Sequence, residues 1–190
     1  MNKTYLALFF GVFVAGVISC DPKSAGSMDS AENQEQLGEN STEEERSSPI
    51  QRLESEISGK LFFVQYGSPS VKGREVWGDL VPYNVVWRTG ANEASFVELS
   101  EEMTVEGEKL PAGKYSLFTI PKENSNWIVI FNSEWDLEHG HFQYDEKNDV
   151  LRVEVSPVWE ETSKEELVIT IEDPGMIIQW EKLKLPIKIQ

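Results

Sequence analysis

The most informative part of the sequence is the stretch KYSLFTI at residues 114–120, followed by WIVIFN at residues 127–132. In the first stretch Tyr115, Leu117 and Thr119 alternate with their neighbours, which places them on one face of a β-strand. The second stretch is almost continuously apolar, which is typical of a strand buried in the middle of a sheet. Together they predict two strands of an all-β domain, the second of them central.

Outward from these two strands, the chain after residue 60 consists of short runs rich in β-branched and aromatic residues, punctuated by Gly, Pro, Asn and Asp. Turn signals recur roughly every 8–12 residues, which predicts an antiparallel β-sandwich of about ten strands, with barrel-like closure as the alternative. The other expected strands are LFFVQY (61–66), VVWRT (85–89), SFVELS (95–100), MTVEG (103–107), HFQY (141–144), VLRVEV (150–155), ELVITIE (166–172), MIIQW (176–180) and KLKLPIKI (182–189).

Prolines and glycines mark where these strands end. Asp173-Pro174-Gly175 is a strong turn signal between two strands. Pro186 cannot donate a hydrogen bond to a neighbouring strand, so we expect its strand to lie at a sheet edge or to contain a bulge. Only residues 133–139 and 50–57 are candidates for short helices.

Residues 1–19 have the pattern of an export signal. Lys3 supplies a positive charge, and YLALFFGVFVAGV (5–17) is too short to span a membrane core of roughly 30 Å. The sequence Val17-Ile18-Ser19-Cys20 resembles a bacterial lipobox, and this resemblance implies cleavage before Cys20 and attachment of lipid to it. Acyl chains anchor proteins stably to membranes, so we expect a lipoprotein of the bacterial cell envelope that faces the periplasm or the cell exterior. A plain secretory signal and a transmembrane anchor are the alternatives.

The chain after the signal divides into a tether and a domain. Residues 20–50 lack aromatic side chains and are poor in apolar ones, which predicts a disordered acidic tether that begins at Cys20. Residues 51–190 form the expected domain; they carry 25 acidic and 14 basic residues, a net charge of −11. Such acidity disfavours nucleic acid as a partner. Because Cys20 is the only cysteine, the sequence excludes an intrachain disulfide, a Cys-rich zinc site and a Cys nucleophile in the domain.

The segment YGSPSVKGREVWGDLVPYNVVWRTGANEAS (66–95) differs from its surroundings, since it contains four glycines and has three basic residues against three acidic ones in an otherwise strongly acidic domain. A long loop of this kind is often functional. Its candidate binding residues for an anion or a sugar are Lys72, Arg74, Trp77, Trp87, Arg88, Asn92 and Glu93, to which Tyr83 adds a third aromatic ring. Arginine offers forked donors to oxyanions, and aromatic rings stack on sugars. Alternatively, Arg88 pairs with Glu93 and the aromatic rings anchor the loop on the core.

Four stretches carry a resemblance to a known family: residues 66–95, LPAGKYSLFTIP (110–121), WIVIFN (127–132) and YDEKNDVLRVEV (144–155). They are similar to the bacterial domain-of-unknown-function family 2911, over about residues 60–190. The resemblance implies an exported all-β protein and supplies no activity or catalytic residue. This sequence departs from the family at His139-Gly140-His141, where an aromatic residue usually precedes the glycine.

The other candidate chemistry is sparse. His139 and His141 would lie on one face of a strand, as two metal ligands can, but no third ligand is dictated, and an exposed polar turn is the alternative. There is no G-x-S-x-G motif, phosphate-binding loop or dinucleotide fingerprint, and no cofactor is expected.

Three interpretations follow from the sequence. The domain is a module that binds a small molecule, a glycan or a protein through the 66–95 segment, an envelope hydrolase that uses a carboxylate there, or a purely structural envelope protein. We favour the first.

Overall fold

The protein is described by a computed structural model that covers residues 46–172 and 175–190. The predicted signal peptide, Cys20 and most of the tether lie outside the described residues. The ten described strands are β1 (Ile50–Ile57), β2 (Lys60–Gly67), β3 (Ser95–Leu99), β4 (Met103–Val105), β5 (Glu108–Leu110), β6 (Gly113–Ile120), β7 (Trp127–Asn132), β8 (Asp149–Val155), β9 (Val158–Glu172) and β10 (Gly175–Lys188). Two short 3₁₀-helices, η1 (Gly140–Gln143) and η2 (Glu146–Asn148), precede β8.

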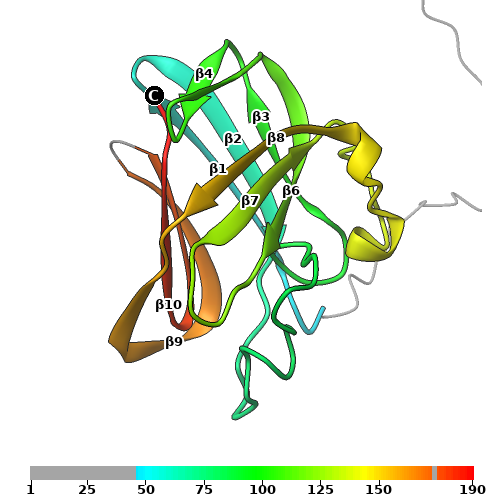
Figure 1. The fold of residues 1–190 in the computed structure, drawn as a ribbon, viewed down its shortest axis with the longest axis vertical. Coiled ribbons are helices and arrows are strands. Elements are labelled where there is room, and N and C mark those ends of the chain that lie inside the picture. The colour runs from blue at the N-terminus through cyan, green and yellow to red at the C-terminus, as the bar shows by residue number, and fades with distance from the viewer. Residues whose placement is uncertain (1–45, 173–174) are drawn as a thin grey trace, which may run out of the picture. The chain divides into compact units, whose positions relative to one another are not determined.

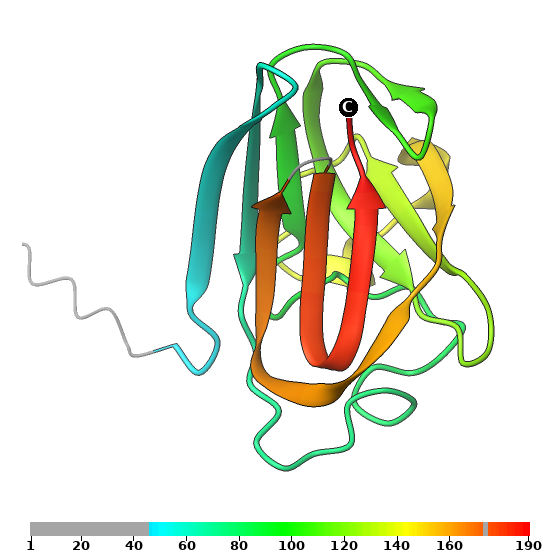
Figure 2. The same cartoon turned by 90° about the vertical axis from the view of Figure 1, so that its left-hand side faces the viewer.

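The strands form a sandwich of antiparallel sheets. A six-stranded sheet in the order β1-β2-β3-β6-β7-β8 faces the β9–β10 sheet, and the β4–β5 hairpin lies beside the C-terminal end of β10 (Figures 1 and 2). The predicted all-β sandwich is therefore confirmed, and the strands form separate sheets rather than one closed barrel.

The strands formed by residues 114–120 and 127–132 pair as neighbours. Leu117 of β6 lies opposite Phe131 of β7, and β7 is flanked on its other side by β8. Five of the six residues of β7 are buried, which fits its central position. The near-continuous apolar run thus reflects burial on both faces of the sheet.

Strand β10 folds back on itself. Figure 2 shows its two arms running side by side in opposite directions. The bend lies at Glu181, whose φ is 54°, and the pairing with β9 shifts register on both sides of this residue. A Cβ atom at Gly175 would overlap the backbone of Ile187, so the two arms approach closely only because residue 175 is glycine. The two strands predicted over residues 176–189 correspond to these arms.

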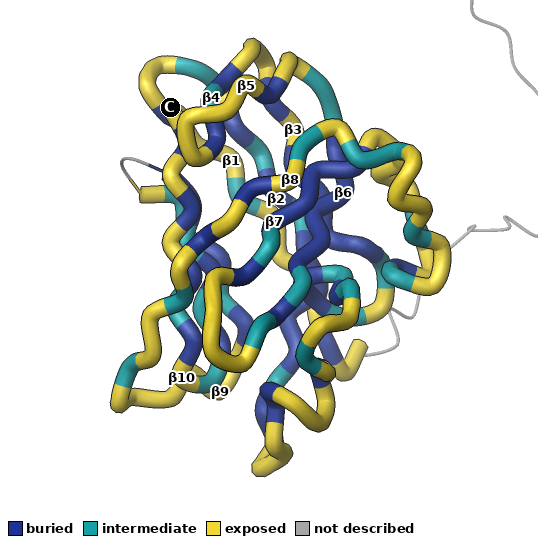
Figure 3. Tube along the Cα trace, in the orientation of Figure 1, coloured by how far each residue is buried: buried dark blue, intermediate teal, exposed yellow. Residues whose placement is uncertain are grey.

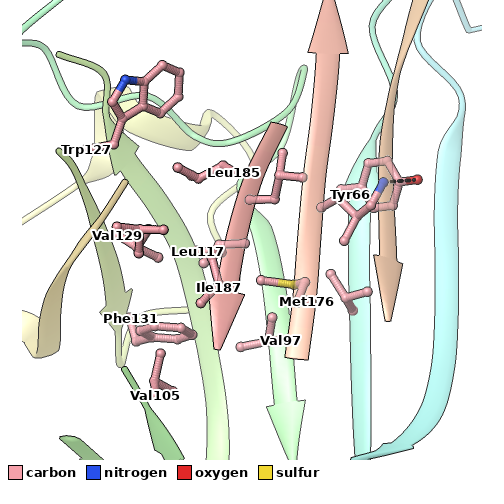
Figure 4. Close-up of a cluster of buried hydrophobic side chains, with 14 of the residues drawn as sticks. Tyr66, Val97, Val105, Leu117, Trp127, Val129, Phe131, Met176, Leu185 and Ile187 are labelled. Carbon is pink, nitrogen blue, oxygen red and sulfur yellow. Dashed lines mark hydrogen bonds between the residues drawn. The ribbon is translucent and has the colours of Figure 1, made fainter. Parts of the chain in front are cut away.

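The core lies between the two sheets. Alternate residues of β6 and β7 meet those of β10, with Leu117, Val129, Met176 and Leu185 fully buried (Figure 4). Tyr66 joins the sheets with a polar contact, because its hydroxyl accepts a hydrogen bond from the backbone N–H of Ile169 at 3.0 Å. Figure 3 shows buried residues along the strands and mostly exposed residues in the turns that join them.

Four local predictions were wrong. Residues 50–57 form β1 rather than a helix, and residues 133–139 form bends and turns. Residues 85–89 form no strand beyond one bridge from Trp87 to Thr119, because Thr89 takes a φ of 53° and turns the chain away. The expected strand at 141–144 overlaps η1, since Gly140 begins a tight turn with a φ of 56°.

Candidate functional site

The glycine-rich segment (residues 66–95) leaves the sandwich at the end of β2 and returns at β3. It lies at one end of the sandwich (Figures 1 and 2). Gly67 and Gly90 hold the two ends of the segment together. A Cβ atom at Gly67 would overlap the carbonyl group of Ala91, and one at Gly90 would lie 2.7 Å from the Ser95 hydroxyl. Glycine at both positions is therefore required for this close approach.

Trp77 and Trp87 anchor the segment on the core. Trp87 stacks on Trp180 of β10 with ring centroids 5.8 Å apart, and its indole N–H donates to the carbonyl of Gly90 at 3.1 Å. Trp77 meets Trp87 edge to face at 5.6 Å and Trp127 at 4.9 Å. Both segment tryptophans are buried, at 8% and 7% exposed. They hold the loop in place, and of the two only Trp87 reaches the cavity described next.

A cavity of about 270 Å³ opens where the segment meets β10 and η1, and we call it the arginine cavity. Its lining residues are Ser48, Pro69, Arg74, Leu80, Val81, Trp87, Arg88, Gly90, Ala91, Asn92, His141 and Trp180. No acidic residue is among them, although residues 51–190 carry 25 acidic side chains. The wall is apolar where tryptophan, leucine and valine line it, and cationic at two arginines.

Arg88 is half-buried and makes few polar contacts. Its guanidinium donates to the backbone carbonyl of Asn92, and it lies 5.7 Å from the ring centroid of Phe142. Gly140 packs against its aliphatic stem, where a Cβ atom would come within 2.7 Å. Within the described chain Arg88 has no carboxylate oxygen within 4.0 Å. Burial lowers the pKa of Arg88, and the more distant charge of Glu93 partly offsets this.

The other two basic residues of the segment, Arg74 and Lys72, differ in whether they line the cavity. Arg74 lines the cavity and donates to the backbone carbonyls of Ser70 and Val71, and it too lacks an ion pair among the described residues. Lys72 is exposed and does not line the cavity, and its backbone N–H donates to the Glu165 carboxylate at 2.8 Å. Arg74 and Arg88 are therefore the two arginines that the fold brings to one cavity.

Glu93 pairs with a residue that precedes the sheet. Its carboxylate accepts a hydrogen bond from Arg46 at 2.5 Å. Partial burial opposes ionisation of Glu93, but the hydrogen bond from Arg46 and the charges of Arg46 and Arg88 together lower its pKa. The expected pair between Arg88 and Glu93 is thus a longer-range attraction rather than a contact.

His141 reaches the cavity from η1, whereas His139 is exposed and does not line it. The Nδ1 atom of His141 is buried and has no hydrogen-bond partner in the described structure. Burial, and secondarily the charge of Arg88, lowers the pKa of His141, so its imidazole is neutral at pH 7. Within residues 46–172 and 175–190 no three His, Cys, Asp or Glu side chains gather as a metal site.

Several lining residues were not expected from the sequence. Trp180 and Ser48 come from distant parts of the chain, and nothing in their local patterns separates them from core or linker residues. The H-x-H pattern did single out His141, although as a metal ligand. Tyr83 does not line the cavity; it packs against the hydrophobic core and approaches Gly78.

The described residues include no helix long and apolar enough to cross a membrane. Residues 48–189 match the family described as Protein of unknown function (DUF2911). Comparison with curated proteins gives no match, and neither does comparison with solved structures.

Proposed function

The chain belongs to the DUF2911 family of proteins of unknown function, and from this premise we propose that it is a lipid-anchored envelope protein whose β-sandwich domain binds a small molecule in the arginine cavity. The observation that carries the binding proposal is the cavity itself. It combines tryptophan and aliphatic walls with a few convergent polar groups, which is the usual composition of a small-molecule site.

The alternative of an envelope hydrolase receives less support. A carboxylate that acts as a general acid needs a raised pKa in a cleft. Glu93, which directly follows the lining residue Asn92, has a lowered pKa and is already bonded to Arg46. No acidic side chain is among the residues that line the cavity. These facts favour binding without chemistry at this site.

The anchoring proposal rests on the lipobox-like sequence that ends at Cys20. Metabolic labelling with an alkynyl fatty acid, followed by mass spectrometry of the mature N-terminus, tests it. We expect label on Cys20 and loss of both label and membrane association in Cys20→Ser. An unlabelled protein whose mature form lacks lipid at Cys20 would overturn anchoring and leave the binding proposal intact.

The binding proposal is tested by a thermal-shift screen of the purified protein against neutral sugars, organic anions and divalent metals. A ligand that binds only the folded state raises the melting temperature by mass action. We expect at least one hit that is lost in Ala91→Leu, which adds bulk to the cavity wall. The matched control is Val150→Leu, which adds bulk at an exposed position of β8 that does not line the cavity. Hits that persist in Ala91→Leu would place the ligand elsewhere.

A further inference from the structure

We infer that the arginine cavity takes a small organic anion, with a carboxylate or phosphate group held by Arg88 and Arg74 and a ring packed on the apolar wall. This inference rests on the proposed binding function and specifies the class of ligand. It is carried by three features of the cavity, which are its charge, its unpartnered polar atoms and its size.

The cationic charge of the cavity has no counterion among the lining residues. Of the arginines elsewhere in the described domain, Arg46 and Arg152 each contact a carboxylate, at 2.5 Å and 2.6 Å, and Arg52 donates to a side-chain amide oxygen. The two cavity arginines contact none in the described residues, and no acidic residue lines the space between them. Arg88 is half-buried and Arg74 is exposed, so the cost of lacking a counterion falls mainly on Arg88. A bound anion would offset that cost with forked, charge-assisted hydrogen bonds.

Unpartnered polar atoms lie on residues of the same cavity. The Trp180 side chain is 1% exposed, and its indole N–H has no acceptor in the described structure. The Nδ1 atom of His141 also has no hydrogen-bond partner there. Arg88 uses its guanidinium for a single carbonyl, that of Asn92. Buried polar groups are rarely left without partners, and such groups beside a cavity are suited to a ligand.

The size and walls of the cavity limit the ligand to a small ring compound. A volume of about 270 Å³ lies just below the range of roughly 300–1,000 Å³ that is common for ligand pockets. Leu80 and Trp180 form part of the wall, and Phe142, which is 78% exposed, lies over Arg88. An exposed phenyl ring at this place offers a surface on which a ligand ring can stack.

The test uses benzoate and phenyl phosphate as probes and benzamide as the neutral counterpart of benzoate. Binding to the purified protein is followed by the indole N–H resonances of Trp87 and Trp180 in nitrogen-15 correlation spectra. We expect saturable shifts with at least one of the two anions and affinity for benzamide weaker by about tenfold or more. Whether the carboxylate or the phosphate binds more tightly identifies the preferred oxyanion.

Arg88→Met keeps the aliphatic stem and removes the charge, so we expect it to weaken anion binding by about tenfold or more. If Arg88→Met does not fold, Arg74→Gln tests the same prediction at a more exposed position. Arg52→Gln removes one charge from the opposite sheet face and should leave affinity unchanged.

The outcomes separate the inference from the function on which it rests. Equal affinities for benzamide and benzoate, or unaltered anion binding in Arg88→Met, would overturn the anionic ligand and leave the binding function standing. If neither benzoate nor phenyl phosphate shifts these resonances, the inference is overturned as well. Only the absence of any cavity ligand in the broader thermal-shift screen removes the binding function itself.

Discussion

Two long connections leave the sandwich, the glycine-rich segment and residues 133–148. An arginine beside the second is paired with a carboxylate, whereas the arginine in the first is not. Beside the second connection, which is drawn in yellow in Figure 1, Asp149 accepts hydrogen bonds from Tyr144 at 2.7 Å, Asn132 at 2.8 Å and Arg152 at 2.6 Å. In the glycine-rich segment, the guanidinium of Arg88 lines a cavity and donates a hydrogen bond only to the backbone carbonyl of Asn92.

The difference teaches how to separate a structural polar group from one that is available to a ligand. The Asp149 network is closed, because every strong donor that it brings together has an acceptor within the domain. Its closure also has a chemical consequence, since burial and then the bond to Asp149 raise the pKa of Tyr144 to about 12. The cavity, by contrast, is open, because the Arg88 guanidinium has only one acceptor and the indole N–H of Trp180 has none among the described residues. Five measurements test this contrast.

The largest effect is expected at the base of the glycine-rich segment. Gly67→Ala places a methyl group onto the carbonyl of Ala91, and backbone cannot yield as a side chain can. We expect a loss of about 3 kcal/mol in the free energy of unfolding, measured by urea denaturation. Gly73→Ala is the matched control, because that glycine has open space around it and only its φ of 68° is unfavourable, which costs about 1 kcal/mol. Equal losses would show that the segment is not clamped at Gly67.

Next in size is the closed network. Asp149→Ala leaves Arg152, Tyr144 and the amide of Asn132 without their common acceptor, and its side chain is 8% exposed. We expect a loss of about 2 kcal/mol in unfolding free energy, reduced from the value for a fully buried pair because Arg152 is one-third exposed. Glu146→Ala removes an exposed partner of Arg152 and should cost far less. Anion binding at the cavity should be unaffected by both changes.

Arg88→Met should show the reverse pattern. It removes one hydrogen bond to a carbonyl and keeps most of the packing against Gly140, so we expect a loss of about 1 kcal/mol in unfolding free energy together with the loss of anion binding. A stability loss as large as that of Asp149→Ala would assign Arg88 a structural role. The distinction between the two connections would then disappear.

The sequence predicts this molecule well where a pattern is local and poorly where contacts are distant. The alternation in residues 114–120 follows directly from which face is buried, and β6 has the expected limits to within one residue. Residues 85–89 are also rich in β-branched and aromatic side chains, yet they form only one bridge. The positive φ of Thr89 turns the chain there and overrides the β-propensity of the run. Arg74 and Arg88 could be chosen as binding residues from their surroundings. Trp180 could not, because only the fold brings β10 beside the segment.

The smallest expected effect is the acid dependence that arises from His141. Burial and Arg88 lower the pKa of His141, so the folded protein binds fewer protons there than the unfolded chain. The contribution of neutral His141 to the free energy of unfolding is therefore fully present above the ordinary histidine pKa of about 6.5. It is lost as the pH falls through the lower pKa that His141 has in the folded protein. His141→Gln should weaken the decline in melting temperature between pH 7 and pH 5.

The same histidine reports on the cavity charge. A bound anion beside Arg88 favours the imidazolium, so saturating benzoate should raise the pKa of His141 in a proton NMR titration, with the His139 resonance as the internal reference. An unchanged His141 titration in the presence of bound benzoate would mean that the anion lies away from η1. In that case Arg88 and His141 would not belong to one site, and the contrast with the closed Asp149 network would apply to Arg88 alone.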